Sequence, residues 1–115
     1  MHTTKGKFNY MDSSPSEAIK KELLSWNGVT VHEHNFVSMI FYVDGIEMGH
    51  IHGDSIADLQ FPVRVSRKLV RDRHVMPHHI IQKSGWVSYE IQNAKDVKAV
   101  IDLFRFQYNR LVKSR

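Results

Sequence analysis

Cysteine is absent from this chain of 115 residues, and other features that would place a protein in a special class are missing too. Without cysteine there is no disulfide, no thiolate metal ligand and no cysteine nucleophile, and nothing in the composition indicates export. Apolar stretches are only a few residues long and no charged-then-apolar leader opens the sequence, so we expect neither a membrane span nor a signal peptide. These absences favour a cytoplasmic protein of bacterial type.

The length suits one domain and excludes two. A chain of this size buries roughly two-thirds of its unfolded surface, which supports one core, whereas a barrel enzyme needs about 250 residues. The 16 lysines and arginines exceed the 12 carboxylates, so the formal charge is +4, and six of the positive charges lie between residues 64 and 83. That segment attracts anions, so small acidic molecules and nucleic acid are the partners to consider.

Hydrophobic periodicity predicts an α+β fold. Residues 1–13 are polar and without periodicity, which is typical of a flexible arm, and residues 14–115 form a single domain. We expect an antiparallel sheet of about five strands packed with three helices, in the order αβββαββα. The expected elements are a helix over 14–26, strands over 29–32, 37–43 and 46–52, a turn-rich connection over 53–61, a helix over 63–72, a loop and strand within 74–83, a strand over 86–91 and a helix from 93.

Asp44-Gly45 is a strong signal for a two-residue hairpin. Closing the hairpin there makes Val43 face Ile46, Phe41 face Met48, Met39 face His50 and Val37 face His52, all on one side of the sheet. Two histidines would then continue an apolar row, and such breaks in pattern tend to occur at functional sites. We therefore expect His50 and His52 to point inward, toward the strand that carries Trp86.

Two motifs carry a family resemblance. Residues 45–54 read G-I-E-M-G-H-I-H-G-D and are followed by Ala57-Asp58-Leu59, Phe61-Pro62 and Arg64, and later His78-His79 precedes Ser84-Gly85-Trp86-Val87-Ser88. Together they resemble a family of small bacterial domains called luciferase-like, over residues 17 to 111. The sequence departs from that pattern at Gln82, where proline is expected, and at Arg73-His74, which replaces a turn containing glycine.

The resemblance does not imply light emission, because flavin-dependent luciferases resemble a barrel several times this mass. A fainter likeness in layout is to the MmcQ/YjbR-like proteins, for which DNA binding has been suggested. We use that second likeness mainly for the fold.

The leading hypothesis is a module that binds a small molecule or anion in one pocket. His50 and His52 lie two apart on a strand, so both leave the same face about 7 Å apart at the backbone. Arg64 would hold a negatively charged group or pair internally with an aspartate, and Trp86 would supply apolar contact or fill the core. The expected lining residues are His50, His52, Asp54, Asp58, Arg64, His79 and Trp86.

Two other functions stay open. An Asp-His pair, or a metal held by histidines and carboxylates, would support hydrolysis, but no serine lies in a nucleophile elbow and no glycine-rich phosphate loop is present. Whether the chain is an enzyme is left open, and we assign neither a cofactor nor a metal. His32 and His34 repeat the spacing but are expected two strands away, about 10 Å from His52.

The remaining alternative is nucleic-acid binding through the basic second helix. We expect no membrane partner. A homodimer formed through a sheet edge or an apolar helix face is compatible with the sequence.

Overall fold

The structure is a computed structural model and describes residues 14–35, 38–73, 76–77 and 85–113. The expected flexible arm and His79 lie outside these ranges. None of the helices in the described ranges has the combination of length and apolar character that crossing a membrane requires. The elements are α1 (Pro15–Leu24), β1 (Val29–His34), β2 (Ser38–Val43), β3 (Ile46–His52), β4 (Ile56–Gln60), α2 (Val63–Arg73), β5 (Met76–Pro77), β6 (Trp86–Glu90) and α3 (Ala94–Lys113).

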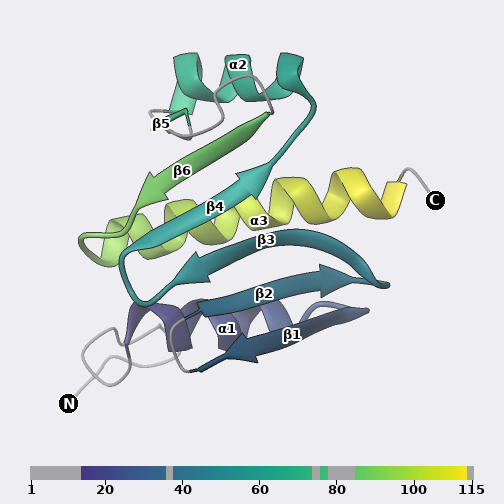
Figure 1. Ribbon diagram of the computed structural model, residues 1–115, viewed down its shortest axis with the longest axis vertical. Coiled ribbons are helices and arrows are strands. Elements are labelled where there is room, and N and C mark those ends of the chain that lie inside the picture. The colour runs from purple at the N-terminus through teal and green to yellow at the C-terminus, as the bar shows by residue number, and fades with distance from the viewer. Residues whose placement is uncertain (1–13, 36–37, 74–75, 78–84, 114–115) are drawn as a thin grey trace.

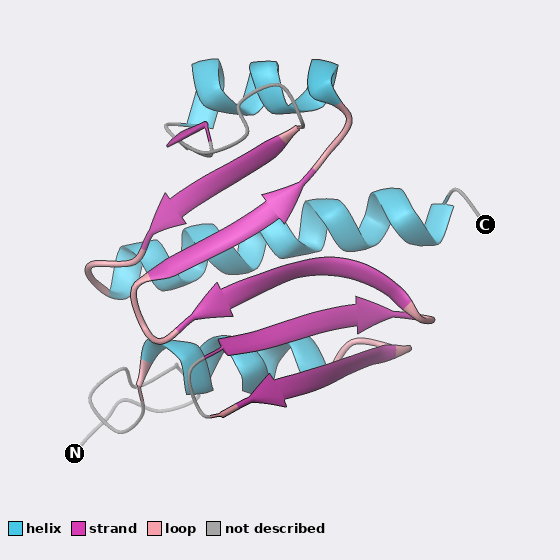
Figure 2. Ribbon diagram, viewed as in Figure 1, coloured by secondary structure: helices cyan, strands magenta, loops and turns pink. Residues whose placement is uncertain are grey.

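The strands form one antiparallel sheet in the order β1-β2-β3-β4-β6-β5, with three helices, which confirms the α+β class (Figures 1 and 2). Helices α1 and α3 lie behind the sheet in Figure 1, whereas α2 lies beyond its β6 end. The front of β2, β3 and β4 carries no helix of the described chain, and we call this side the open face.

The core lies between the sheet and the two helices behind it. Phe104 of α3 contacts Phe41 of β2 edge to face, with ring centroids 5.5 Å apart. The apolar residues of α3 recur every three or four positions, which gives the helix one face to bury. The largest fully buried side chains include Ile19, Leu23, Phe41, Met48, Ile51, Leu59, Leu103 and Phe104.

The hairpin of β2 and β3 closes at Asp44-Gly45 as predicted, but its register does not continue as predicted. Val43 pairs with Ile46, yet Phe41 pairs with Gly49, because a β-bulge leaves Met48 without a partner in β2. Beyond the bulge His50 pairs with Ile40. A one-residue slip moves every following side chain to the other face of the sheet.

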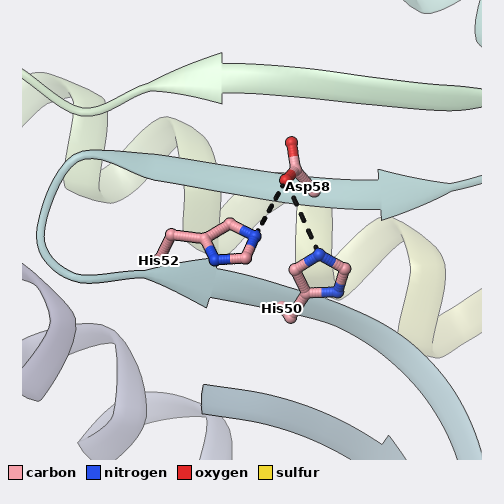
Figure 3. Close-up of side chains that lie close together, drawn as sticks. All are labelled: His50, His52 and Asp58. Atoms are coloured by element: carbon pink, nitrogen blue, oxygen red, sulfur yellow. Dashed lines mark ion pairs between the residues drawn. The ribbon is translucent and has the colours of Figure 1, made fainter. Parts of the chain in front are cut away.

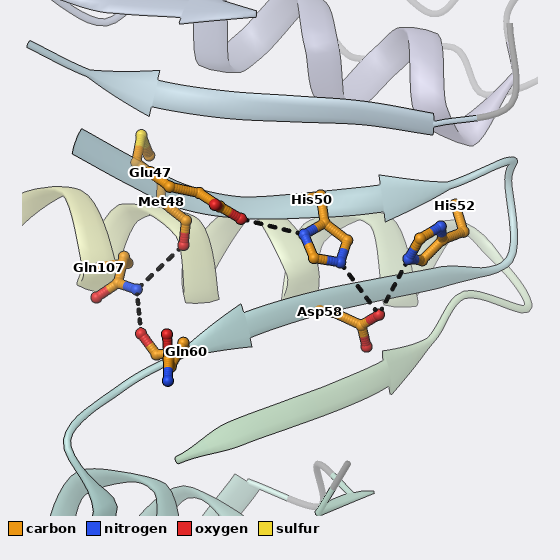
Figure 4. A network of polar contacts seen from close by, with 7 residues as sticks. All are labelled: Glu47, Met48, His50, His52, Asp58, Gln60 and Gln107. Carbon is orange, nitrogen blue, oxygen red and sulfur yellow. Dashed lines mark hydrogen bonds and ion pairs between the residues drawn. The ribbon is translucent and has the colours of Figure 1, made fainter. Parts of the chain in front are cut away.

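The prediction that His50 and His52 continue the apolar row is therefore wrong. Gly49 and Ile51 are buried toward the helices, and the two histidines project from the open face (Figure 4). Alternation alone could not reveal this, because a bulge adds one residue without changing the composition of the strand.

Residues 56–60 form strand β4 and not the predicted turn-rich connection. β4 lies in the interior of the sheet between β3 and β6, and its Ala57, Asp58 and Leu59 are buried. Turn residues flank this segment and aspartate is disfavoured in strands, so the sequence signal for a strand is weak. Pairing on both edges outweighs that preference. The predicted strand within 74–83 is described only at β5, since residues 78–84 lie outside the described chain.

Strands β3 and β4 pair only over His50 to His52, and the part of β3 before His50 curves away from β4 (Figure 1). The buried side chain of Gln107 fills the gap from α3: its amide nitrogen donates to the carbonyl oxygens of Met48 at 3.0 Å and Gln60 at 2.7 Å (Figure 4). This amide provides hydrogen bonds to β3 and β4 where the two strands no longer pair with each other. The bulge and Gln107 together fix the part of β3 that precedes the histidines.

Candidate functional site: the His-Asp cluster

Three titratable side chains converge on the open face (Figure 3). His50 pairs directly with Asp58 across β3 and β4, and His52 follows two residues later on the same face. Nε2 of His50 lies 3.6 Å from Oδ2 of Asp58, and Nε2 of His52 lies 3.3 Å from the same oxygen. We call His50, His52 and Asp58 the His-Asp cluster.

Asp58 is the buried member of the cluster, with 4% of its surface exposed. Its other oxygen, Oδ1, accepts a hydrogen bond from the hydroxyl of Ser88 on β6 at 2.5 Å. A carboxylate is costly to bury unless it is paired and hydrogen-bonded. The serine and the two imidazoles together compensate for that cost.

His50 is held from both ring nitrogens. Its Nδ1 lies 3.2 Å from Oε2 of Glu47, opposite the Nε2 contact with Asp58 (Figure 4). Hydrogen bonding to Asp58 raises the pKa of His50 above its ordinary value, Glu47 adds to the increase, and burial opposes it. The ring centroid of Trp86 is 5.3 Å away and that of His52 is 4.8 Å away. His52 is the accessible member, with 52% of its side chain exposed.

The bulge explains why Glu47 takes part. Glu47 and His50 are three residues apart, so in an uninterrupted strand their side chains would point to opposite faces. With Met48 as the extra residue, both lie on the open face (Figure 4). Neither Glu47 nor Ser88 was among the predicted site residues. The available signal for Ser88 was the alternation of β6, which places it on the same face as Trp86.

Gly49 allows β3 to approach β4 and α3 closely behind the cluster. A Cβ at Gly49 would lie 2.8 Å from the backbone oxygen of Asp58 and 3.1 Å from the ring of Phe104. A glycine inside a strand is typical of a place where another part of the chain approaches closely. The ring that packs there is that of Phe104.

Two predicted site residues lie elsewhere. Oδ1 of Asp54 accepts the backbone N–H of Ser16 in the first turn of α1 at 2.9 Å, and hydrogen bonds from Ser16 and Ser14 lower its pKa. Arg64 is exposed at the start of α2 and, within the described chain, pairs with neither Asp54 nor Asp58. The expected internal salt bridge of Arg64 is therefore not formed there.

A cavity of about 290 Å³ lies beside the first turn of α1. Of the six predicted site residues that the structure describes, only Asp54 lines it. The structure thus brings together His50, His52, Asp58 and Trp86, and separates this group from Asp54. His79 belongs to the part of the chain that is not described.

The second H-x-H pair lies on the same face but apart from the cluster. His32 pairs with Ile40, which pairs with His50, so β2 separates the two histidine pairs as predicted. The rings of His32 and His34 are 5.8 Å apart and exposed. Among the described residues, they belong to no group of converging histidines and carboxylates. They are a natural control for the cluster.

A family comparison accounts for the same region of the chain. The model of the Luciferase domain family matches residues 45–107, more than half of the sequence, including the bulge, the cluster and Gln107. The chain belongs to the Luciferase domain family. Comparison with curated proteins and with solved structures gives no match. The luciferase-like resemblance is thereby confirmed, and the likeness to MmcQ/YjbR-like proteins stays a prediction.

Proposed function

We propose that this Luciferase domain binds a small anionic molecule on the open face of its sheet, at the His-Asp cluster. The observation that carries the proposal is the convergence of two imidazoles on one buried carboxylate, on a face that no described helix covers. The second histidine, half exposed, leaves a polar surface that a ligand can reach.

The cluster supplies both parts of such a site. The half-exposed His52 supplies the polar part, because an imidazole N–H donates hydrogen bonds to negatively charged groups. The ring of Trp86 beside His50 supplies an apolar wall. Because Arg64 and Asp54 lie elsewhere, the anion depends on the histidines and not on a guanidinium.

Thermal unfolding with a panel of small carboxylates and phosphate esters tests the proposal. A ligand at about 100 times its Kd adds about 2.7 kcal/mol to the stability of the folded protein. We expect a compound that raises the Tm of the wild type and of His32→Ala but not of His52→Ala. A panel without stabilisers, or equal stabilisation of both variants, would contradict the proposal.

Nucleic-acid binding is the second candidate, and α2 is the element that favours it. Its cations recur at helical spacing on an exposed face, and its first turn carries no acidic residue. Binding through this face would weaken steeply as salt increases and would fall in the double variant Arg67→Ala with Arg71→Ala. An affinity for nucleic acid that does not change with ionic strength would eliminate this candidate. The exposed cations of α2 are Arg64, Arg67, Lys68 and Arg71.

A further inference from the structure

We propose that the His-Asp cluster is the ligand set of a divalent transition-metal ion, for which Zn²⁺ and Co²⁺ are suitable probes. The inference rests on the proposed function, because it takes the same cluster as the binding centre. It deepens that function by naming the chemistry: an ion held by the protein would bind the anionic group of the small molecule directly.

The spacing of the donor atoms fits such an ion. One ligand atom from each of His50, His52 and Asp58 lies within 4.8 Å of the other two. Ligands about 2.1 Å from a tetrahedral zinc ion are about 3.4 Å from one another. The two measured distances to Oδ2 of Asp58, 3.3 and 3.6 Å, are close to that value. Small side-chain rotations would bring the two Nε2 atoms to it as well.

The groups around the cluster are those that metal ligands need. A histidine that binds a metal through one ring nitrogen almost always donates its other N–H to a carboxylate or carbonyl. Nδ1 of His50 has Glu47 in that position, and Nε2, which faces Oδ2 of Asp58, is the atom that would bind the ion. The ligating carboxylate is itself expected to be hydrogen-bonded. The hydroxyl of Ser88 donates to Oδ1 of Asp58, the oxygen that does not face the histidines. Two of the three proposed ligands therefore have such an orienting partner.

The donor types narrow the choice of ion. Imidazole nitrogens with one carboxylate suit zinc, iron, cobalt or nickel, whereas calcium and magnesium prefer oxygen ligands alone. Three protein ligands leave at least one coordination position for solvent or a ligand group. The exposure of His52 places that position on the open face. This is the arrangement of a binding or catalytic ion and not of a closed structural one.

The sequence itself contains the control for this site. His32 and His34 have the same spacing on the same face, with exposed rings, but join no converging carboxylate among the described residues. A polar network that only stabilises the sheet would give metal affinities that depend equally on either pair. A built site would depend on His52 and not on His32.

The test uses tag-free protein from which metal has been removed with a chelator. Co²⁺ is titrated into it and binding is followed by the visible absorption of the bound ion, and Zn²⁺ binding is measured by calorimetry. We expect one equivalent to bind to the wild type and to His32→Ala, and the affinity of His52→Ala to fall more than tenfold. Glu47→Gln, which alters an orienting partner, is expected to lower affinity about 10-fold to 100-fold. His52 and Glu47 are exposed enough for both variants to fold, which circular dichroism checks.

Equal affinity in His52→Ala and the wild type, or the absence of stoichiometric binding, would overturn the metal site. The anion panel repeated in chelator separates the two proposals. Stabilisation by an anion that persists in chelator and requires His52 would leave the proposed function standing without the metal. Metal binding that requires His52, with no anion stabilising the loaded protein, would leave the metal site standing without the proposed function.

Discussion

His50 and Asp58 lie directly opposite each other in the antiparallel pairing of β3 and β4, with Nε2 and Oδ2 3.6 Å apart. They share one face because directly paired residues of neighbouring strands point to the same side of the sheet. That side is the open face because β3 has one extra residue, Met48, relative to β2. The same extra residue brings Glu47 onto the face of His50. A single irregularity in one strand therefore assembles the polar side of the sheet.

The hydroxyl of Ser88 is the first contact to test. It donates to a buried carboxylate, and a hydrogen bond to a charged group contributes about 1.5 to 3 kcal/mol. We expect Ser88→Ala to lower the free energy of unfolding by that amount in urea denaturation. The exposed Ser55 provides the control, and Ser55→Ala should change stability by less than about 0.5 kcal/mol. Equal effects would show that Ser88 does not stabilise Asp58.

Gly49 tests the close packing behind the cluster. An added Cβ would lie 2.8 Å from the oxygen of Asp58 and 2.9 Å from Cγ of Leu59, and neither can move without shifting β4. Gly49→Ala is therefore expected to cost about 1 to 3 kcal/mol by overpacking. At Gly53 a Cβ meets nothing within 4 Å, but φ is +54°, so Gly53→Ala should cost about 1 kcal/mol from backbone strain alone. Chemical denaturation measures both losses of stability. A larger loss in Gly53→Ala than in Gly49→Ala would contradict this packing.

Gln107 tests the separation of β3 and β4. Replacing it with leucine keeps the bulk but removes the donor to the carbonyls of Met48 and Gln60. The buried carbonyl of Met48 would lose this donor, and a buried acceptor left unsatisfied costs about 1 to 3 kcal/mol. We expect Gln107→Leu to lower stability by about 1 to 3 kcal/mol and to speed hydrogen exchange in β3, whereas Gln92→Leu, at an exposed position, should do neither. Unchanged exchange in β3 would argue that the amide is dispensable.

Asp54 gives a prediction about pH. Hydrogen bonds from Ser16 and Ser14 lower its pKa, so the folded protein binds a proton there less tightly than the unfolded chain. The resulting stabilisation is present above the unfolded pKa of about 3.9 and is lost as pH falls through the folded pKa. Asp54→Asn keeps an acceptor oxygen but loses the negative charge near the N-terminus of α1, so it should be less stable than the wild type near neutral pH by about 0.3 to 1 kcal/mol, and the difference should shrink in acid. A difference independent of pH would contradict this role.

Much of the fold was accessible to sequence reasoning because its signals are local. The helix over 14–26, the Asp44-Gly45 turn and the helix from 93 were each predicted from residues within one element, and the structure has α1, the β2–β3 turn and α3 at these places. Strand β4 was missed because its flanking residues favour turns and Asp58 disfavours a strand. Only the neighbours on both sides, β3 and β6, make that segment extended.

The candidate site was predicted in part. His50, His52, Asp58 and Trp86 were named from the sequence and lie together, but their binding role stays a prediction. Asp54 and Arg64 were named because they are near in sequence, yet Asp54 accepts the backbone N–H of Ser16 in the first turn of α1 and Arg64 is exposed on α2. Glu47 was missed because strand alternation places it on the opposite face from His50.

The sequence alone determined the α+β class, the three helices, the main hairpin and the two-residue spacing of the histidines, because each depends on residues within a few positions of one another. The tertiary structure decided which face the histidines occupy and which carboxylate they meet. Those features depend on the register between strands, where one extra residue at Met48 reverses every side chain that follows. No local pattern carries that information, since it arises from pairing and packing across the sheet.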